Sequence, residues 1–536
     1  MDVYGFGELM LDEMPFEPTE QQIKLTAALA RFCSAQTPSD TVFILNGYAG
    51  TGKTSVMGAL VRSLRKVGLN TVLLASTGRA AKVLSGFTGF PAYTIHRKIY
   101  SSDSFSPDGF SSGAKINRNP HVNTFFIVDE ASMIGEGNDG GLNLLQDLAM
   151  YVYTGVNCKL ILLGDTAQLP PVGSSQSPAM TAEAFRKMGL KVTRATITST
   201  VRQQKQSGIL YNATWLRRAM SQWQKATQSQ PVEPPILPSQ LSASPSQKPA
   251  EPPQLPEPQI TVSPFDDVEL VSPEELEDSL GQSFAEFGQE QTIMITRSNR
   301  RAVDFNMAIR RQIFEREEIL TVGDRLLIAK NNYYWPARER ARRLEEIRAA
   351  MESSGSDEVA ALNERCGALP DFLANGEVAE VEAIYATDTR DNIIFADVRL
   401  HLPDSDSSLD AKIVLDSLTS ETAALPYEKL ETIGRRTLQE AAQKAANPLG
   451  QPAQLSMARQ RAALKECPYY NALQVKYAYA VTCHKAQGGQ WQSVFVDMGY
   501  IPPEAYRTLD FYRWLYTSVT RATTRLSLVN PSCKIV

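Results

Sequence analysis

Residues 47–54 read Gly-Tyr-Ala-Gly-Thr-Gly-Lys-Thr, which matches the phosphate-binding pattern GxxxxGK[ST]. The apolar run 41–45 before them is typical of a buried strand, and the spacing of apolar residues over 55–67 predicts a helix. A strand, a glycine-rich loop and a helix in this order are the context in which this pattern holds a nucleotide. The sequence therefore predicts an α/β fold with a nucleotide site at residues 47–54.

The residue types in this loop fit the groups of a nucleoside triphosphate. Glycine allows the backbone to wrap a phosphate closely, so that main-chain N–H groups point inward. Lys53 places a cation at the β- and γ-phosphates, and the Thr54 hydroxyl suits a Mg²⁺ ion. We therefore expect ATP and Mg²⁺ as cofactors. The predicted nucleotide contacts in the loop are Gly47, Gly50, Thr51, Gly52, Lys53, Thr54 and Ser55.

Length and composition restrict the class of protein. The chain has 536 residues, enough for roughly three or four domains. Its formal net charge is −5, so a nucleic-acid site would have to be a local basic groove. The six cysteines include no CxxC pair, which favours reduced thiols over a zinc site or a disulfide framework. Because no apolar run approaches the ~20 residues of a membrane span, we expect a cytoplasmic protein, in bacteria one of the cytoplasm or nucleoid.

Apolar strands alternate with helical segments over residues 16–175, which predicts a parallel sheet with helices on both faces. Within this region, residues 101–123 are rich in Ser, Gly, Asn and Pro. We expect them to leave the sheet as a small excursion, in the form of a hairpin. The expected strands are 42–46, 71–75, 125–128 and 159–163.

The rest of the chain predicts a second α/β region, which is divided by an inserted barrel. A stretch rich in Pro, Ser and Gln, about 228–264, predicts a disordered or extended insert. The α/β pattern resumes at 292–296, and short strands beyond about residue 320 predict a small β-barrel. Helical stretches at 337–365 and about 426–465 interrupt or flank it. The first is dense in Arg and Glu, so it is either a nucleic-acid arm or a solvated helix whose charges pair internally.

A second apolar strand ends in two acids, Asp129 and Glu130. Parallel strands place such residues at the carboxyl edge of the sheet, beside the phosphate loop. Asp129 can hold the Mg²⁺ ion, and Glu130 can orient and deprotonate the attacking water. The next strand leads to Gln168, which can sense the terminal phosphate. Hydrolysis also needs cations over the charge of the transition state, and the candidates are Arg202 and Arg521.

Taken in order along the chain, these segments resemble the motifs of the superfamily 1B helicases, the RecD-like enzymes and their Dda-type relatives. The residues of motifs V and VI are specific to this family, because ordinary P-loop ATPases lack these motifs. The barrel of the family is represented by residues 323–332 and 375–377. The motifs correspond to 16–22 (glutamine motif), 47–54 (I), 75–81 (Ia), 93–96 (Ib), 129–130 (II), 164–173 (III), 200–203 (IV), 481–488 (V) and 516–522 (VI).

The resemblance implies two RecA-like parallel-sheet motor domains, an inserted SH3-like β-barrel and a small excursion in the first motor domain. Domain 1A would span 1–175 with its excursion at 97–123. Domain 2A would span 176–318 and 473–536, and barrel domain 2B would span 319–472 with helical insertions.

The resemblance also implies the roles of further side chains. Gln22, or alternatively Gln21, would contact the adenine base. Motifs Ia, Ib and V would line a track for single-stranded DNA, because hydroxyl and imidazole groups bind phosphates without reading sequence. Lys485 and Gln487 would face the nucleotide side of the cleft. The track candidates are Thr77, Arg79, Thr94, His96, Thr482 and His484, and the candidates for the strand-separating pin are Phe105 and Phe110.

The implied function is an ATP-dependent DNA helicase that moves 5′→3′ on single-stranded DNA and acts at junctions with duplex DNA, in repair, recombination or replication. We expect a monomeric motor. The Pro-rich insert is either passive or a docking site for a protein partner. Two other functions stay open: an RNA helicase of the same superfamily, and a P-loop ATPase switch that does not move on nucleic acid.

Overall fold

The computed structural model describes residues 2–100, 105–106, 109–110, 115–135, 143–199, 207–228, 254–353, 363–364, 366–370, 372–445, 452–531 and 533–536. The chain forms two compact units. The first consists of residues 1–166, 170–201 and 296–489, and the second of residues 167–169, 202–295 and 490–536.

The first unit contains a six-stranded parallel sheet with the strand order β3-β2-β6-β7-β1-β8. The four strands predicted in this region are all present. The sheet also includes β8, which pairs with β1 from Thr41↔Lys191 to Gly47↔Ile197. Because β8 follows residue 175, the sheet extends past the predicted domain boundary. The strands are β1 (Thr41–Gly47), β2 (Asn70–Ala75), β3 (Ala92–Thr94), β6 (Thr124–Asp129), β7 (Lys159–Gly164) and β8 (Lys191–Ile197).

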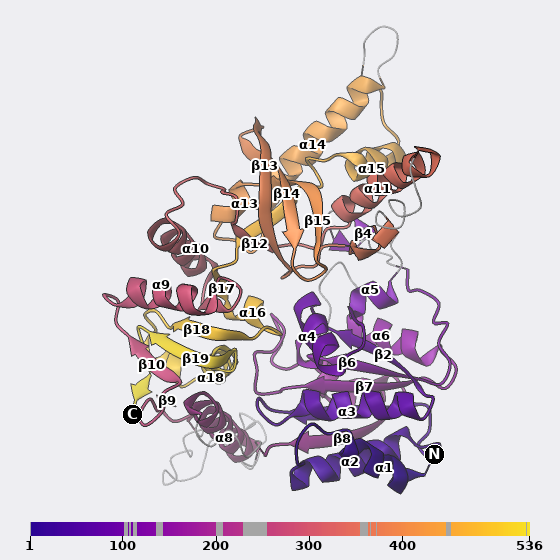
Figure 1. The fold of residues 1–536 in the computed structure, drawn as a ribbon, viewed down its shortest axis with the longest axis vertical. Coiled ribbons are helices and arrows are strands. Elements are labelled where there is room, and N and C mark those ends of the chain that lie inside the picture. The colour runs from indigo at the N-terminus through magenta and orange to yellow at the C-terminus, as the bar shows by residue number, and fades with distance from the viewer. Residues whose placement is uncertain are drawn as a thin grey trace, which may run out of the picture. The chain divides into compact units, whose positions relative to one another are not determined.

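Alternate side chains of β1 enter two separate cores, as the period of two in a strand requires. Phe43 and Leu45 pack with α1, α2 and α3, whereas Val42 and Ile44 pack with α5, α6 and α7. Helices therefore cover both faces of the sheet, as predicted (Figure 1). These helices are α1 (Val3–Asp12), α2 (Glu20–Cys33), α3 (Lys53–Lys66), α5 (Ile95–Ile99), α6 (Leu144–Tyr153) and α7 (Ala182–Lys187).

The predicted excursion contains a short antiparallel hairpin of β4 (Phe105–Ser106) and β5 (Gly109–Phe110). Phe105 and Phe110 are register partners in this hairpin. Their side chains lie outside what the structure describes, so their assignment to a pin stays a prediction.

The predicted barrel is also present, as a closed barrel of five strands within the first unit. Its last strand, β16, pairs with β12 and β15, so the predicted boundary at residue 472 is several residues too early. The strands are β12 (Arg325–Ile328), β13 (Val378–Arg390), β14 (Ile393–Leu402), β15 (Ser407–Val414) and β16 (Leu473–Tyr477), and the helices beside them are α11 (Tyr334–Ser353), α13 (Asp416–Thr419), α14 (Tyr427–Lys444) and α15 (Met457–Glu466).

Helix α11 has the internal charge pairing that was one of its two interpretations. Arg342 and Arg343 both bind the Glu339 carboxylate, at 2.6 and 2.8 Å. Arg342 also pairs with Glu346 one turn further on. This pattern favours a helix whose charges are paired over a nucleic-acid arm.

After β16 the chain continues through β17 (Ala480–Thr482) into α16 (Cys483–Ala486), still within the first unit. The Asn306 side chain on α10 (Asn299–Ala308) fixes this passage. Its Oδ1 accepts from the backbone N–H groups of Tyr479 at 3.1 Å and Ala480 at 2.8 Å, and its Nδ2 donates to the Ala480 carbonyl at 2.7 Å.

In the second unit, four strands form a parallel sheet in the order β10-β19-β18-β11. Of the predicted Pro-rich insert, residues 229–253 lie outside the described residues. The end of the insert is ordered, because β9 (Gln259–Ile260) pairs with β20 (Lys534–Ile535). The elements are β10 (Val268–Val271), β11 (Thr292–Thr296), β18 (Trp491–Asp497), β19 (Ala522–Val529), α8 (Gly208–Gln228), α9 (Leu276–Phe287), α17 (Pro503–Tyr506) and α18 (Leu509–Val519). In the described part of the chain, no helix is both long and apolar enough to cross a membrane.

Candidate functional site

The phosphate-binding loop connects the end of β1 to the first turn of α3. Gly50 and Gly52 have φ angles of +72° and +75°, a left-handed conformation that glycine adopts without steric cost. A Cβ atom at Gly47 would collide with Cγ of Lys53. Because α3 begins at Lys53, its N-terminus and the backbone N–H groups of the loop offer the donors that the predicted phosphate site requires.

The charged groups expected around a nucleotide meet at this loop. Lys53 Nζ donates to the carbonyl oxygens of Gly47 and, at 3.4 Å, Tyr48. Burial raises the pKa of the Asp129 carboxyl, while the Lys53 charge and the Glu130 N–H, at 2.8 Å, oppose the rise. Glu130 has a φ of +51°, which is uncommon for a residue with a side chain and recurs at active sites.

These residues fit a nucleotide with its Mg²⁺ ion. The loop offers inward N–H groups and a lysine amine for phosphate oxygens, and Thr54 and Asp129 offer the hard oxygen ligands that Mg²⁺ prefers. A buried carboxylate beside a lysine is stabilised further by a divalent cation, because the cation offsets the cost of burying the charge.

Gln22 braces the loop from α2. Its side chain is 1% exposed, and both polar atoms of its amide have protein partners. Oε1 accepts from the Thr19 N–H at 2.8 Å in a capping box, and Nε2 donates to the Thr51 carbonyl at 3.0 Å. The alternative residue, Gln21, accepts from the Thr198 N–H at 2.7 Å. A contact of either glutamine with adenine stays a prediction.

Two other predicted catalytic residues lie in the second unit, next to α18. Gln168 is buried, and its carbonyl oxygen has no hydrogen-bond partner among the residues that the structure describes. The following N–H, of Leu169, donates to the Thr517 hydroxyl of α18 at 2.9 Å. Arg521 follows the same helix, is 4% exposed and donates from Nε to the Thr517 carbonyl at 3.0 Å. Motifs III and VI thus meet at Thr517, whereas Arg202 lies outside the described residues.

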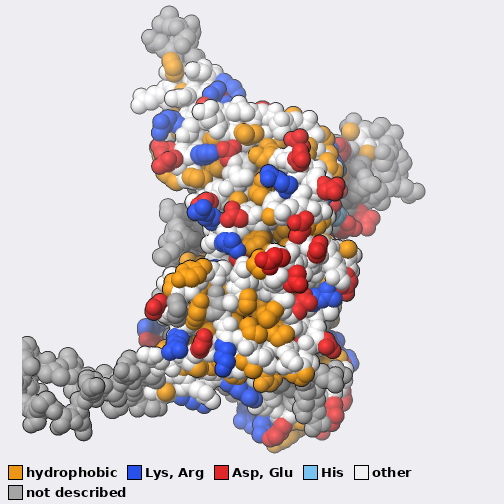
Figure 2. Space-filling model, turned by 90° about the vertical axis from the view of Figure 1, so that its left-hand side faces the viewer, with side chains coloured by type: hydrophobic (Ala, Val, Ile, Leu, Met, Phe, Trp, Pro, Cys, Tyr) orange, Lys and Arg blue, Asp and Glu red, His pale blue; other side chains and the backbone are white. Residues whose placement is uncertain are grey.

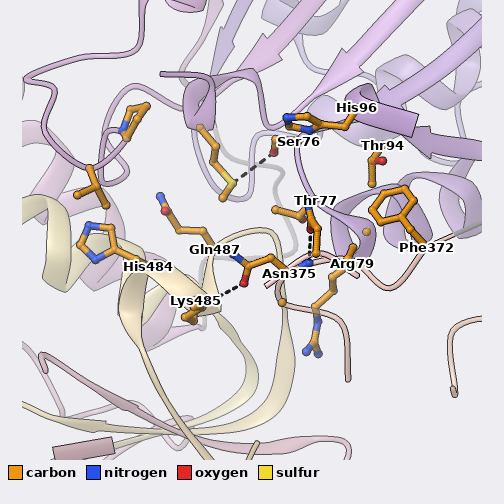
Figure 3. A pocket seen from close by; sticks show the side chains of 17 residues that line it. Ser76, Thr77, Arg79, Thr94, His96, Phe372, Asn375, His484, Lys485 and Gln487 are labelled. Atoms are coloured by element: carbon orange, nitrogen blue, oxygen red, sulfur yellow. Dashed lines mark hydrogen bonds between the residues drawn. The ribbon is translucent and has the colours of Figure 1, made fainter. Parts of the chain in front are cut away.

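A pocket of about 440 Å³ in the first unit brings the predicted strand track together (Figure 3). Its walls come from motifs Ia and Ib, from motif III, from the barrel and from motif V. Thr482 is not among the described residues that line it. The predicted track residues that do line it are Thr77, Arg79, Thr94, His96 and His484.

The two threonines of this track also cap helices. Thr77 Oγ1 accepts from the Ala80 N–H at 3.2 Å where α4 (Gly78–Thr88) begins, and Thr94 Oγ1 accepts from the Arg97 N–H at 3.3 Å where α5 begins. A hydroxyl that accepts in this way keeps its own hydrogen to donate elsewhere. Helix capping and contact with a phosphate are therefore compatible.

The barrel contributes to this pocket, which the sequence did not predict. Asn331, Phe372 and Asn375 line it, although the barrel motif carried no predicted role in binding. Lys485 and Gln487 were expected to face the nucleotide, but the structure places both in this pocket (Figure 3). The sequence feature that could have indicated this contribution is the polar segment 375–377, which lies between two barrel strands.

The pocket is basic although the chain is acidic. Among its described lining residues none is Asp or Glu, while Arg79, Lys485 and two histidines are present. Elsewhere, Lys and Arg are interspersed with Asp and Glu on the face drawn in Figure 2. This matches the expectation of a local basic groove in a chain of net charge −5.

Comparison with known proteins bears on the same motifs. The AAA domain family matches residues 24–232, and the UvrD-like helicase C-terminal domain family matches residues 477–529. The ATP-dependent RecD2 DNA helicase of Deinococcus radiodurans is 36% identical over 129 residues, which are 24% of this chain and 16% of that protein. Over these segments the chain is similar to the AAA domain, to the C-terminal domain of UvrD-like helicases and to the RecD2 DNA helicase.

The chain spans about a sixth of the length of the RecD2 relative that it matches. Similar solved structures include the Pif1 helicase from Bacteroides in complex with ADP-AlF3 and single-stranded DNA, at 13% identity and a TM-score of 0.41 over 96% of this chain and 93% of that one. The Pif1 helicase from Candida albicans is 16% identical, with a TM-score of 0.38 over 96% and 95% of the two chains.

Proposed function

We propose that this protein is an ATP-dependent DNA helicase that moves on single-stranded DNA. The observation that carries the proposal is that one sheet edge serves both sites. The carboxyl ends of β1 and β6 lead to the phosphate loop and to Asp129, and those of β2 and β3 lead to the acid-free pocket. A nucleotide site and a basic groove on adjacent strands are what a nucleotide-driven motor on an anionic polymer requires.

The residues have distinct tasks in this proposal. Bound Mg²⁺–ATP supplies a phosphoryl group whose developing charge needs stabilisation. Thr54 and Asp129 hold the ion, Lys53 offsets the charge of the β- and γ-phosphates, and Glu130 orients water and takes its proton. Gln168 contributes the buried acceptor that lacks a described partner. Arg202 and Arg521 serve as the arginine fingers, Gln22 contacts adenine, and the other contacts are those predicted in the phosphate loop.

The register of the sheet supports coupling between the two sites. Asp129 pairs with Ala75, and Ala75 pairs with Thr94 on its other side. A shift of the β6 end on hydrolysis would therefore reach β2 and β3 through backbone pairs, since packed strands move together. The strand would be gripped by the track residues at the ends of β2 and β3 and by motif V.

We also propose 5′→3′ movement, action at junctions of single-stranded and duplex DNA, a monomeric motor and a cytoplasmic location. The experiment is an unwinding assay on duplexes with a 5′ or a 3′ single-stranded tail. We expect ATP-dependent unwinding from the 5′ tail. Unwinding from the 3′ tail alone would refute the direction but keep the helicase, and no unwinding from either tail would refute the helicase.

The alternatives are separated by the rate of ATP hydrolysis with single-stranded DNA, with RNA and without nucleic acid. Stimulation by DNA is the expected result. Stimulation by RNA alone would identify an RNA helicase, and no stimulation would identify an ATPase switch. Unchanged unwinding after deletion of residues 229–253 would restrict the Pro-rich insert to partner docking or a passive role.

A further inference from the structure

Two segments of the barrel reach the pocket, one at Asn331 and the other a tightly held turn, residues 372–377. The Glu377 carboxylate accepts from the Ala374 N–H at 2.7 Å, and the Asn331 side chain accepts from the Asn375 N–H at 2.7 Å. Gly376 has a φ of +90°, which a residue with a side chain rarely adopts. The turn therefore presents the Asn375 side chain in one defined direction, because the backbone on both sides of it is fixed.

That side chain binds a cation of motif V. The Asn375 carbonyl oxygen accepts from Lys485 Nζ, and both side chains line the pocket (Figure 3). No carboxylate of the described residues pairs with Lys485. Burial lowers the pKa of Lys485 to about 8, so the amine is still charged at pH 7. A half-buried cation without a negative partner is costly unless an anion binds beside it.

We propose that Lys485 binds a backbone phosphate of the single strand and that Asn375 is the positioning residue that holds its amine toward the pocket. This inference rests on the proposed function of the pocket as a strand site. It assigns a specific part of strand binding to the barrel, 110 residues away from Lys485 in sequence.

The chemistry of the pair favours positioning over neutralisation. An ammonium group has three hydrogens, so one can bind Asn375 while the others remain for phosphate oxygens. The amide oxygen is neutral and leaves the full positive charge available to the ligand. An aspartate at this position would accept the same hydrogen bond but would neutralise the lysine and repel the phosphate.

The first test measures how the affinity for an oligo-dT strand depends on salt concentration. Loss of one phosphate contact lowers the slope of log K against log salt by about 0.7 for single strands. We expect this decrease in Lys485→Met, and recovery of most of the slope in Lys485→Arg. Lys444→Met is the matched control, because Lys444 is an exposed lysine at the end of α14, and its slope should equal that of the wild type. A wild-type slope in Lys485→Met would refute the contact.

The second test separates positioning from folding. We expect Asn375→Asp to weaken oligo-dT binding about tenfold or more, and Asn375→Ala to weaken it less, with unfolding temperatures close to that of the wild type. In the Lys485→Met background, Asn375→Ala should change affinity by less than about twofold, since the group that Asn375 positions is absent. An equal effect of Asn375→Ala in the two backgrounds would refute the positioning role.

The outcomes also distinguish this inference from the proposed function. If the wild-type protein does not bind oligo-dT, the strand site itself is refuted. If the wild type binds and Lys485→Met keeps the full salt slope, the strand site stands and the roles of Lys485 and Asn375 are refuted.

Discussion

Asp129 of β6 is the register partner of Ala75 of β2, the first residue of motif Ia. The proposed Mg²⁺ ligand is thus one backbone pair away from the start of the segment that lines the strand pocket. Ala75 is completely buried and packs against Ala80 and Ala81 of α4. This row of small residues leaves little room for independent movement of the two sites.

Enlarging Ala75 should weaken this coupling. We expect Ala75→Val to lower the free energy of unfolding by about 1–3 kcal/mol, because extra methyl groups do not fit a packed core. The effect of a non-hydrolysable ATP analogue on the affinity for single-stranded DNA should shrink as well. Ala195→Val, at a half-buried position of β8 that pairs with Leu45 and lies outside this row, is the control. An equal loss of coupling in both variants would contradict the role of the Ala75 row.

Lys53→Ala tests the nucleotide site. The variant loses the cation at the phosphates, and we expect the rate of ATP hydrolysis to fall at least ~100-fold, with unwinding lost, because one such charge is worth on the order of 3 kcal/mol in a transition state. Binding of single-stranded DNA, measured by fluorescence anisotropy, should persist. Full ATP turnover by Lys53→Ala would refute the site.

Gln22→Ala separates a brace from a base contact. The variant loses the bonds to Thr19 and Thr51, so we expect the free energy of unfolding to fall by about 1–3 kcal/mol. If the side chain only braces the loop, the affinities for ATP and GTP should fall by the same factor in a binding titration. A loss confined to ATP would instead identify Gln22 as the adenine contact that the family resemblance implies.

The stability of the barrel turn should depend on pH through Glu377. Burial raises the pKa of this carboxyl to about 7, from an ordinary value near 4.5. Between these values the folded state binds the proton and the unfolded state does not, so stability is lost as pH rises toward 7. The loss is about 1.4 kcal/mol of unfolding free energy per pH unit.

Glu377→Gln is the matched variant, because its amide oxygen can still accept from the Ala374 N–H. We expect urea unfolding at pH 5, 6 and 7 to show a shallower decline for this variant than for the wild type. Parallel declines would show that Glu377 keeps an ordinary pKa.

The parts of the fold that sequence patterns predict well are local ones. The segment 41–67 combines a buried strand, a glycine-rich loop and a helix, and each can be inferred from neighbouring residues alone. Strand β8 was missed because all of its side chains except that of Ile197 are exposed or half-buried, so its apolar pattern is weak and its place depends on pairing with β1. The boundary at 472 failed for a similar reason, since β16 joins the barrel through partners far away in sequence.

The same distinction applies to the site. Motif residues such as Lys53 and His96 were identified from short patterns, and the structure places them at the loop and in the pocket. The pairing of Asn375 with Lys485 could not be predicted, because it depends on how the barrel turn meets motif V in space. Sequence spacing also gave no indication that Lys485 and Gln487 line the strand pocket.

The connection between the barrel and motif V has a mechanical consequence. Only Ala478 and Tyr479 separate β16 from β17, and Asn306 fastens the backbone there with three hydrogen bonds. A connection of two residues that is fixed in this way cannot lengthen when the barrel is pulled or pushed. In the proposed motor, a protein bound to the DNA ahead that pushed against the barrel would therefore transmit its force directly to motif V, with no loose chain between the two to absorb it.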